Sequence, residues 1–386
     1  MVARDASLLH PIKMAKKFNP PSYDMSLADH GFDATEYRGL TYPLGEHAPE
    51  IGELYHLLPD IGWTRLPVPG NLRHINIWLL ADEDEHGEGV AIVDTGLQLP
   101  DTIAAWEKLF AGPLKDKRVT RVIVTHFHPD HVGMAGWLCK KFGVRLWMNR
   151  TEWLMARMLT ADIRNAPPEE AIGQMRLAGW DEARLENMRQ KGWGNFAKAV
   201  SPLPLGHVRL FDEQLLTIGH RKWRILTGGG HTPEHSCLYD EDNKIIIAGD
   251  QILPRITSNV SMMASEPEAN PLAEWLESIE KFKLRMHDDT LVLPAHGEPF
   301  HGVQQRLDYL AKGHYDRLDK LEAALKQRPH RAVDCFGILF DRDIDDSVYG
   351  LATGEAMAHL QYLEKSGRIP VKIIDNVQWF GGANNF

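Results

Sequence analysis

Cysteine is scarce in this sequence, and long apolar runs are absent from it. Three cysteines occur among 386 residues, at Cys139, Cys237 and Cys335. They are far apart and odd in number, so no disulfide framework is expected; each is predicted to be a small buried apolar residue in a reducing, cytoplasmic setting. Because no run reaches about 18 apolar residues, we expect no membrane span. Only Leu8 and Leu9 approach the apolar segment of a signal peptide, and we expect none.

Basic charge is also in short supply. The chain carries 43 Lys and Arg against 53 Asp and Glu, which gives a formal net charge of -10 at pH 7. This balance disfavours nucleic acid, a polyanion, as the main partner, and favours a small-molecule substrate. With 43% hydrophobic residues, the chain can bury the core of one large domain and of a small second one.

The densest group of chemically active side chains is the stretch 125–131, with the sequence THFHPDH. Residues 119–124 before it are apolar and β-branched for the most part, which predicts a short buried strand. His126 and His128 then point the same way, because side chains alternate along an extended chain. The strand end therefore presents two histidines to one small volume.

The residues that follow predict a helix. We expect Pro129 to end the strand and Asp130 to occupy the N-cap of a helix that stops near Gly143. Asp130 and His131 would then join the two histidines of the strand end as candidate ligands, because imidazole nitrogens and carboxylate oxygens bind divalent metals. The alternative is a pair of solvated histidines with a capping aspartate.

A second polar strand end is Asp94-Thr95-Gly96, which follows the predicted strand 89–94. These residues fit an Asx-type turn with the glycine in a left-handed conformation. They fit equally a role for Asp94 in orienting a metal-binding histidine. The sequence leaves both interpretations open.

Three later strand ends carry further candidate ligands. The predicted strand 222–226 leads into GGGHTPEHS, which contains His231 and His235. We predict that His231 is a ligand and that His235 has a structural hydrogen-bonding role, with ligation by His235 as the alternative. One apolar strand ends in Asp250, a predicted ligand by position, and another delivers His296 to the same rim.

Together these motifs resemble the metallo-β-lactamase-fold hydrolase superfamily over roughly residues 66–301. The resemblance implies an α/β (α+β) four-layer αββα sandwich with two divalent metal ions between the sheets. It assigns the ligands to two sets and one bridge: His126, His128 and His231; Asp130, His131 and His296; and Asp250 between them. One departure is Glu234, which stands where the superfamily's HTPGHS segment has glycine and puts only the local turn in doubt.

The resemblance also implies hydrolysis. A bridging aspartate is typical of glyoxalase II-like thioesterases, lactonases and phosphodiesterases, and is typically missing from true β-lactamases of the superfamily. Nitrogen and oxygen ligands favour Zn²⁺, with manganese or iron as alternatives. The implied mechanism has a metal-bridging hydroxide attack a thioester, ester or lactone carbonyl, while Asp130 orients the nucleophile and shuttles a proton. The alternatives are an endoribonuclease or phosphodiesterase, β-lactam hydrolysis as a main or side activity, and a non-catalytic binding protein.

We expect three segments: 1–60 as an N-terminal arm and lead-in, 61–305 as the catalytic domain, and 306–386 as a C-terminal domain. A helical insertion rich in Met and Trp occupies about 150–200. It is either an ordinary helical layer or a lid that covers the metal site and meets an apolar acyl chain. Substrate-selecting candidates, which also fit an ordinary loop, are Arg255, Asn259, Ser261 and Met262.

The C-terminal domain is predicted to contain two amphipathic helices, at 307–325 and 347–366, and a hairpin around Asp375-Asn376. This order resembles a winged-helix module, and some related hydrolases with such a tail are endoribonucleases. Residues 306–386 carry 11 basic and 12 acidic side chains, whereas a module that reads nucleic acid is normally basic. We therefore expect this domain to pack on the catalytic domain, cap the site or form a homodimer contact.

Overall fold

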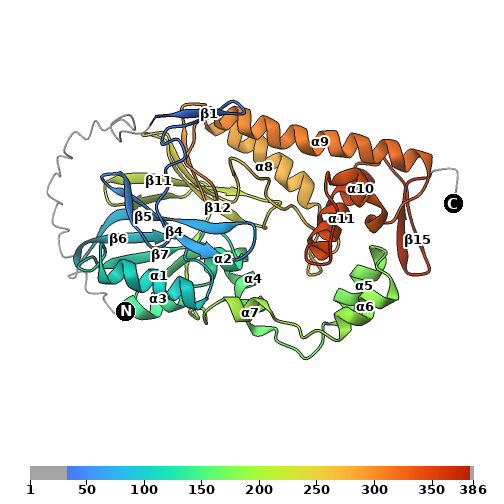
Figure 1. Cartoon of the computed structure of the whole chain (residues 1–386), viewed down its shortest axis with the longest axis horizontal. Coiled ribbons are helices and arrows are strands. Elements are labelled where there is room, and N and C mark those ends of the chain that lie inside the picture. The colour runs from blue at the N-terminus through green and yellow to red at the C-terminus, as the bar shows by residue number, and fades with distance from the viewer. Residues whose placement is uncertain (1–32, 383–386) are drawn as a thin grey trace, which may run out of the picture.

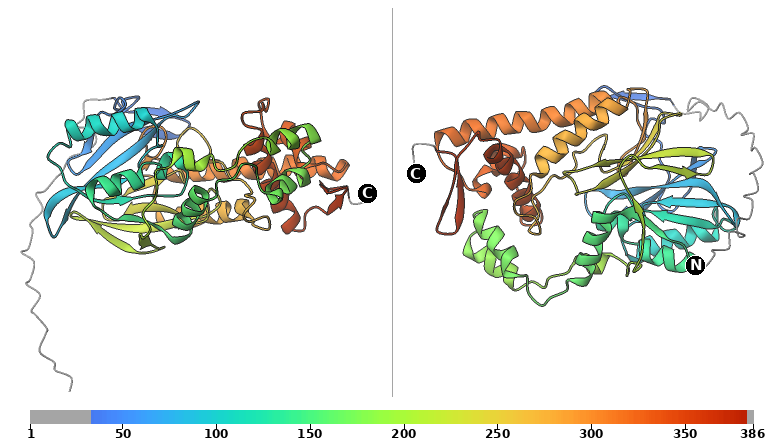
Figure 2. Two further views of the ribbon diagram at one scale, coloured as in Figure 1. Left: turned by 90° about the horizontal axis from the view of Figure 1, so that it is seen from below. Right: turned by 180° about the vertical axis from the view of Figure 1, so that it is seen from behind.

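The structure is a computed structural model that describes residues 33–382. Two β-sheets face each other across a shared apolar core, and helices cover their outer faces (Figures 1 and 2). The predicted four-layer sandwich is confirmed. Helices and a small hairpin follow it at the C-terminal end, as predicted.

The larger sheet has seven strands that lie in chain order. They are β3 (Tyr55–Leu58), β4 (Ile61–Val68), β5 (Arg73–Asp84), β6 (Gly87–Val93), β7 (Val119–Ile123), β8 (Leu146–Asn149) and β9 (Val208–Leu210). Strands β3 to β6 pair antiparallel, and β6 to β9 pair parallel. Parallel pairing brings the carboxyl ends of β6 and β7 to one edge, where ligands collect in α/β folds.

The smaller sheet has five strands, again in chain order. They are β10 (Leu215–Ile218), β11 (Arg221–Gly228), β12 (His235–Asp240), β13 (Ile245–Gly249) and β14 (Leu291–Pro294). Only β13 and β14 pair parallel within this sheet. Their carboxyl ends therefore meet at one edge, and Asp250 and His296 follow directly from them.

Bulky apolar side chains fill the space between the sheets. Trp63, Trp78 and Trp223 are at most 2% exposed there, among isoleucine and leucine side chains of both sheets. Helices α1 (Pro100–Ala111) and α3 (Ala135–Phe142) pack on the outer face of the larger sheet. Helices α8 (Pro271–Arg285) and α9 (Val303–Gln327) cover the smaller sheet (Figure 1). Burial of both faces of each sheet accounts for their long apolar runs.

The helical insertion divides into two parts. Helices α4 (Arg150–Ala161) and α7 (Phe196–Ala199) stay on the catalytic domain. Helices α5 (Glu169–Leu177) and α6 (Glu182–Arg189) extend to the C-terminal helices instead (Figure 1). Trp180 after α5 donates its indole N–H to Thr353 Oγ1 at 2.9 Å. The outer pair thus bridges to the C-terminal domain.

The C-terminal domain consists of helices followed by a hairpin. After α9 come a 3-10 helix (Ala332–Cys335), α10 (Phe336–Leu339), α11 (Tyr349–Lys365), β15 (Val371–Ile374) and β16 (Val377–Phe380). Asp375 and Asn376 take φ values of 50° and 62°, the left-handed pair that a two-residue hairpin requires. Helix α9 begins at Val303, so it crosses the predicted domain boundary at residue 306 as one continuous helix.

The structure describes the lead-in to the catalytic domain from residue 33 onward. Strands β1 (Thr35–Tyr37) and β2 (Leu40–Tyr42) form a small hairpin, and Tyr42 and Leu44 are buried. Most of the predicted arm falls on residues 1–32, outside the described residues. None of the helices within residues 33–382 combines the length and the apolar character that a bilayer crossing needs. All three cysteines are buried and unpaired, as predicted.

Candidate metal centre

The HFHPDH segment leaves the carboxyl end of β7 and enters α2 (Pro129–Val132). His126 Nε2 and His128 Nδ1 come within 2.9 Å of each other, close enough to contact one ion. The prediction that Asp130 caps the helix was wrong: the N-cap is His128, and Asp130 lies in the first turn. Proline is favoured at the first helical position because it has no N–H to satisfy, so the helix starts two residues earlier than expected.

All seven predicted ligands lie around one point. Their donor atoms form two groups, each within 4.8 Å: His126, His128, His231 and Asp250; and Asp130, His131 and His296. We call His126, His128 and His231 the first ligand group. Asp130, His131 and His296 form the second ligand group. Side chains from four strand ends and one helix therefore converge as the motif order implied.

Asp250 faces both ligand groups. Its Oδ2 lies 3.3 Å from His231 Nε2 and 3.9 Å from His126 Nε2. Its Oδ1 lies 3.5 Å from His131 Nε2 and 3.4 Å from His296 Nε2. One carboxylate oxygen is thus available to each group, which is the arrangement that a bridging ligand needs.

Backbone carbonyls orient two of the ligand histidines. His231 Nδ1 donates to the carbonyl of Asn259 at 2.7 Å, and His296 Nδ1 donates to the carbonyl of His74 at 2.7 Å. With the proton held on Nδ1, the Nε2 lone pair points into the centre. Such outer hydrogen bonds fix the tautomer and the ring orientation of metal-binding histidines.

Asp94 orients a third histidine, His131. Its Oδ2 accepts from His131 Nδ1 at 2.8 Å, and its Oδ1 accepts from the Thr125 N–H at 2.8 Å. Asp94 itself has a φ of 63°, so a left-handed backbone turns the carboxylate toward the histidine. The orienting role of Asp94 is therefore the one observed, and Gly96 also has the expected left-handed conformation, with a φ of 83°.

The two ligand groups differ in their electrostatics. Burial, followed by neighbouring histidines, lowers the pKa of His126 well below its usual value and that of His128 to about 3. At His131 burial also lowers the pKa, but Asp94, Asp250 and Asp130 outweigh it and raise the pKa well above the usual value. The carboxylate charges gathered around the second group stabilise cations there.

The donor set fits divalent metal ions. Four of its buried atoms have no hydrogen-bond partner within the described chain: His131 Nε2, His231 Nε2, His296 Nε2 and Asp250 Oδ1. Buried polar atoms are rarely left unsatisfied, and each such group needs a physical reason. These four face one another across the centre, so shared cations account for all of them at once.

His235 has the predicted hydrogen-bonding role. Its Nε2 accepts the backbone N–H of Asp250 at 3.1 Å, and its ring lies 4.7 Å from that of His126. Burial lowers the pKa of His235 well below the usual value, so it is the neutral imidazole that an acceptor must be. His235 therefore holds the backbone of Asp250 in place.

Glu234, the departure from the superfamily pattern, has a role of its own. Its Oε2 accepts the N–H of Thr151 at 2.9 Å, in the first turn of α4. Asn149, the N-cap of that helix, makes no side-chain capping bond. Glu234 therefore supplies the acceptor and the negative charge that a helix N-terminus favours.

Glu152 is a residue that sequence reasoning missed. This fully buried carboxylate on α4 accepts the N–H of Phe127 at 2.9 Å and the N–H of Glu234 at 2.7 Å. It thereby ties the loop of His126 and His128 to the loop of His231. Burial raises the pKa of Glu152 to about 7. The only sequence signal was a charged residue inside an apolar helical pattern, which is more commonly a surface position.

The substrate-selecting candidates have different surroundings. Ser261 lines a pocket beside His231, together with Met263. Asn259 orients His231, Met262 is buried at 7% exposure, and Arg255 pairs with Glu298 at 2.9 Å. Of the four, only Ser261 lies against this pocket.

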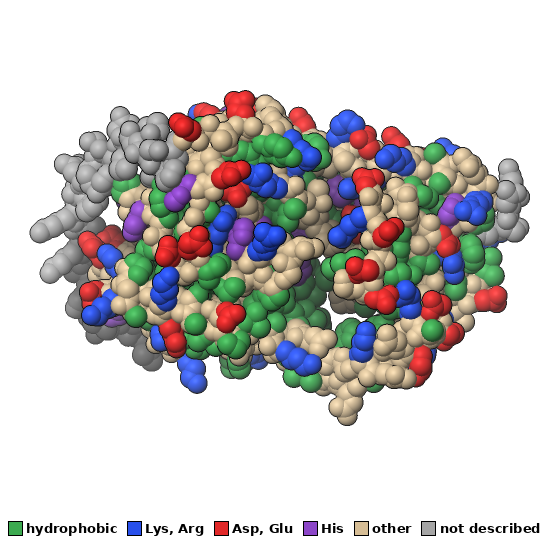
Figure 3. All heavy atoms as spheres, in the orientation of Figure 1, with side chains coloured by type: hydrophobic (Ala, Val, Ile, Leu, Met, Phe, Trp, Pro, Cys, Tyr) green, Lys and Arg blue, Asp and Glu red, His purple; other side chains and the backbone are tan. Residues whose placement is uncertain are grey.

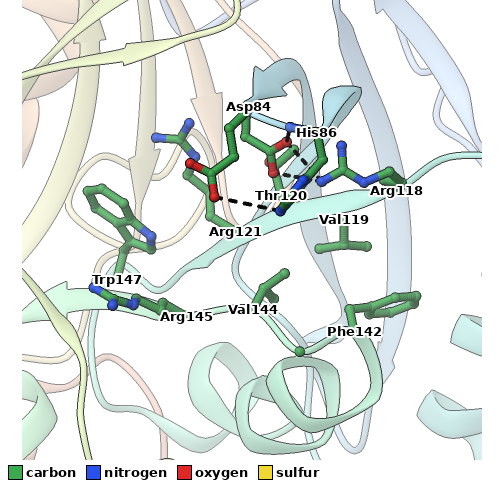
Figure 4. A pocket seen from close by; sticks show the side chains of 12 residues that line it. Asp84, His86, Arg118, Val119, Thr120, Arg121, Phe142, Val144, Arg145 and Trp147 are labelled. Atoms are coloured by element: carbon green, nitrogen blue, oxygen red, sulfur yellow. Dashed lines mark hydrogen bonds and ion pairs between the residues drawn. The ribbon is translucent and has the colours of Figure 1, made fainter. Parts of the chain in front are cut away.

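A larger cavity of about 730 Å³ lies at the opposite end of β7 (Figure 4). Arg118, Arg121, Arg145 and Trp147 are among its lining residues, and Arg118 pairs with Asp84 at 2.7 Å. None of the seven predicted ligands lines it. We therefore place the candidate site where the donor atoms converge, and not at the larger cavity.

The fold and the centre define a class, that of metal-dependent hydrolases with ligands at the edge of an αββα sandwich. A family model described as the metallo-beta-lactamase superfamily matches residues 70–323, and one described as the metallo-beta-lactamase-like C-terminal domain matches residues 318–382. The chain belongs to the metallo-β-lactamase superfamily, and the resemblance drawn from its motifs is confirmed.

Known proteins similar to this chain agree with that assignment. A solved β-lactamase domain protein from Burkholderia ambifaria is 37% identical with a TM-score of 0.82, over 89% of this chain and 98% of that one. The probable metallo-hydrolase YqjP of Bacillus subtilis is 22% identical over 310 residues, 79% of this chain and 92% of the relative. Hydroxyacylglutathione hydrolase GloC of Haemophilus influenzae is 22% identical over 223 residues, 58% of this chain and 85% of the relative.

Proposed function

We propose that the protein hydrolyses a thioester or a related ester or lactone of a small molecule at a binuclear centre, with Zn²⁺ as the resident metal. The observation that carries this proposal is Asp250, which presents one oxygen to each ligand group. The two groups and Asp250 together offer imidazole nitrogens and carboxylate oxygens, and such donors suit zinc.

Divalent ions held between these groups would polarise the substrate carbonyl and lower the pKa of a water molecule to roughly 7, which supplies a nucleophile at neutral pH. The protein has to hold that arrangement and to move a proton. Asp130 is placed for the proton: its side chain is 16% exposed, and its Oδ2 lies 3.3 Å from His296 Nε2. Burial raises its pKa, but His131 and His296 outweigh that effect, so the pKa is lowered and the carboxylate is ionised.

Apolar side chains beside the centre support a carbonyl substrate with an apolar acyl group. The rings of Phe127 and His128 lie 4.8 Å apart, and Phe196 of α7 lies 6.3 Å from Phe127. Met155 and Met263 belong to the same apolar cluster. Figure 3 shows a hollow between the catalytic domain and the C-terminal helices with hydrophobic side chains inside it. The similarity to a hydroxyacylglutathione hydrolase supports a thioester as the bond cleaved.

The charge of the C-terminal domain supports a small molecule over RNA. Several of its basic side chains are already paired with carboxylates: Arg331 with Asp334, Arg368 with Glu322, and Lys312 with Asp316. Paired cations release few counterions from a polyanion, so they contribute little to nucleic-acid affinity.

Elemental analysis followed by a substrate panel tests the proposal. The panel contains an acyl-CoA, an acyl-glutathione, a lactone, a β-lactam, an alkyl sulfate and a structured RNA, each with the metal-loaded and the chelator-treated protein. We expect two divalent ions per chain and metal-dependent turnover of a thioester. Metal-loaded protein that cleaves none of the carbonyl substrates would falsify the proposal, and RNA cleavage that declines with salt would replace it with the nuclease alternative.

A further inference from the structure

The loop between β13 and α8, residues 250–270, is held by the C-terminal helices. Arg306 of α9 is 4% exposed, and its guanidinium donates to the carbonyls of Leu253 at 2.5 Å and Ile256 at 2.6 Å. Farther along the loop, the N–H of Met262 donates to the carbonyl of Gly354, inside α11, at 3.1 Å. The loop that follows Asp250 therefore takes its shape from α9 and α11 as well as from the sheets.

Gly354 is an unusual residue for its place. Glycine in a helix interior costs roughly 1 kcal/mol relative to alanine, because it loses more backbone freedom on folding. A Cβ at position 354 would lie 2.9 Å from both Cβ and Oγ of Ser261. The missing side chain thus lets the helix backbone touch the loop at Ser261.

From that contact a short chain of hydrogen bonds leads to the metal centre. Ser261 Oγ donates to Asn259 Oδ1 at 2.5 Å, and Asn259 Nδ2 donates to Glu355 Oε2 of α11 at 3.4 Å. The carbonyl of the same Asn259 accepts from His231 Nδ1 at 2.7 Å. Both the contact at Gly354 and the contact at Glu355 therefore fix the residue that orients a ligand.

We propose that α11 is a positioning element for the first ligand group and that Gly354 is the residue through which it acts. Close packing at Gly354 sets where the loop lies, and the loop places the Asn259 carbonyl that aims His231 at its ion. The proposal rests on the metal centre proposed above, but it does not depend on which bond the enzyme cleaves.

The test is the substitution Gly354→Ala, measured as metal affinity. Alanine is the better helix former, so the substitution by itself stabilises α11. The added Cβ, however, pushes against the loop at Ser261. We expect one of the two metal-binding steps, resolved by chelator competition on the full chain, to weaken by about 10- to 100-fold, the usual cost of disturbing an outer partner of a ligand. That step should be the one that His231→Ala abolishes. Thermal unfolding of the metal-free protein should be unchanged or slightly raised.

Two further variants keep the outcome interpretable. Gly350→Ala adds the same methyl group to the same helix where nothing lies within 4 Å, and it should leave both binding steps unchanged. Ser261→Gly removes the two atoms nearest the new Cβ, together with the hydrogen bond to Asn259 Oδ1. The affinity of this single variant is therefore the reference, and adding Gly354→Ala to it should cost little further affinity. General destabilisation of the helix could not produce that non-additivity.

The failures are distinguishable. Wild-type affinity at both steps in Gly354→Ala overturns the positioning role alone. Equal weakening of both steps overturns it as well, and so does a full further loss of affinity when Gly354→Ala is added to Ser261→Gly, because the effect would then not pass through the loop. A wild-type protein that binds no divalent ion overturns the metal centre together with this inference.

Discussion

The two ligand groups sit side by side but are built differently. In the first group, burial keeps His126 and His128 neutral by lowering their pKa values, that of His128 to about 3. In the second group, the carboxylates of Asp94, Asp250 and Asp130 outweigh burial and raise the pKa of His131. Nitrogen-rich sites suit zinc, whereas oxygen-rich sites also accept harder ions such as manganese. The two ligand groups therefore offer a metal ion unequal charge and unequal donor atoms.

The two groups also differ in what holds them. The second group takes its support from within the sandwich, since Asp94 directly follows β6 and the carbonyl of His74 belongs to β5. The first group depends on elements far away in the chain, namely Glu152 of the insertion and the loop that α11 contacts. Damage to the outer elements should therefore reach the first group before the second.

The largest effect is expected where the groups share a residue. Asp250→Asn removes one of the charges that both groups face, so both ions should bind more weakly by more than the roughly 10- to 100-fold typical of an outer partner, and turnover should be lost. Elemental analysis after dialysis measures this, with circular dichroism as the control for folding. Retention of two ions per chain would mean that Asp250 does not bridge.

Removing Glu152 should break the first group's support and cost stability as well. Glu152→Ala leaves the N–H groups of Phe127 and Glu234 without their acceptor, and each unsatisfied buried donor costs about 1–3 kcal/mol. We expect a lower urea midpoint and weaker binding at the first group. Glu186→Ala, an exposed position on α6 of the same insertion, is the matched control; equal effects in the two variants would contradict the role of Glu152.

Asp94→Asn should act on the second group alone. Asparagine has one carbonyl oxygen for two partners, so its amide nitrogen must face either the Thr125 N–H or His131 Nδ1. In the second case the proton of His131 moves to Nε2 and blocks the lone pair that binds metal. We expect roughly 10- to 100-fold weaker binding of one ion, with the step assigned to His231 intact. Loss of the step assigned to His231 would instead contradict the assignment of Asp94 to the second ligand group.

The smallest effect is a pH dependence of the outer support. His314 of α9 and His359 of α11 are buried, with Nδ1 and Nε2 3.2 Å apart. Burial, His359 and Arg317 lower the pKa of His314 to about 3, and burial lowers that of His359 to about 4 although the Glu355 carbonyl opposes this.

Both histidines are neutral when folded and take up a proton near pH 6.5 when unfolded. The stability they contribute is complete above pH 6.5 and is lost as the pH falls toward 4 and then 3, by about 1 kcal/mol per histidine at pH 6. Urea unfolding of the metal-free protein at pH 8 and pH 6 measures this loss. His314→Gln should remove about half of the difference, and an unchanged slope in that variant would contradict the assignment.

Much of the centre could be predicted from the sequence, because its ligands are polar residues placed directly after apolar strands. His126, His128, Asp250 and His296 stand out in that way, and parallel strand ends must meet at one edge. What could not be predicted acts through atoms without a sequence signature. The orienting group of Asn259 is a backbone carbonyl, and Glu152 resembles a surface residue until its helix is packed. The docking of α5 and α6 on α11 likewise depends on long-range contacts that no local pattern encodes.

Helix α9 makes it difficult to divide this protein into two separately folded fragments. Its first turns lie on the smaller sheet, its last turns carry the C-terminal domain, and Arg306 near its start ties down the carbonyls of Leu253 and Ile256. A chain shortened at residue 305 would keep all seven ligands and yet lose the cation that shapes the segment next to the bridging carboxylate. The catalytic domain and the C-terminal domain therefore depend on each other for structure, and a fragment of either would not keep the conformation that it has in the whole chain.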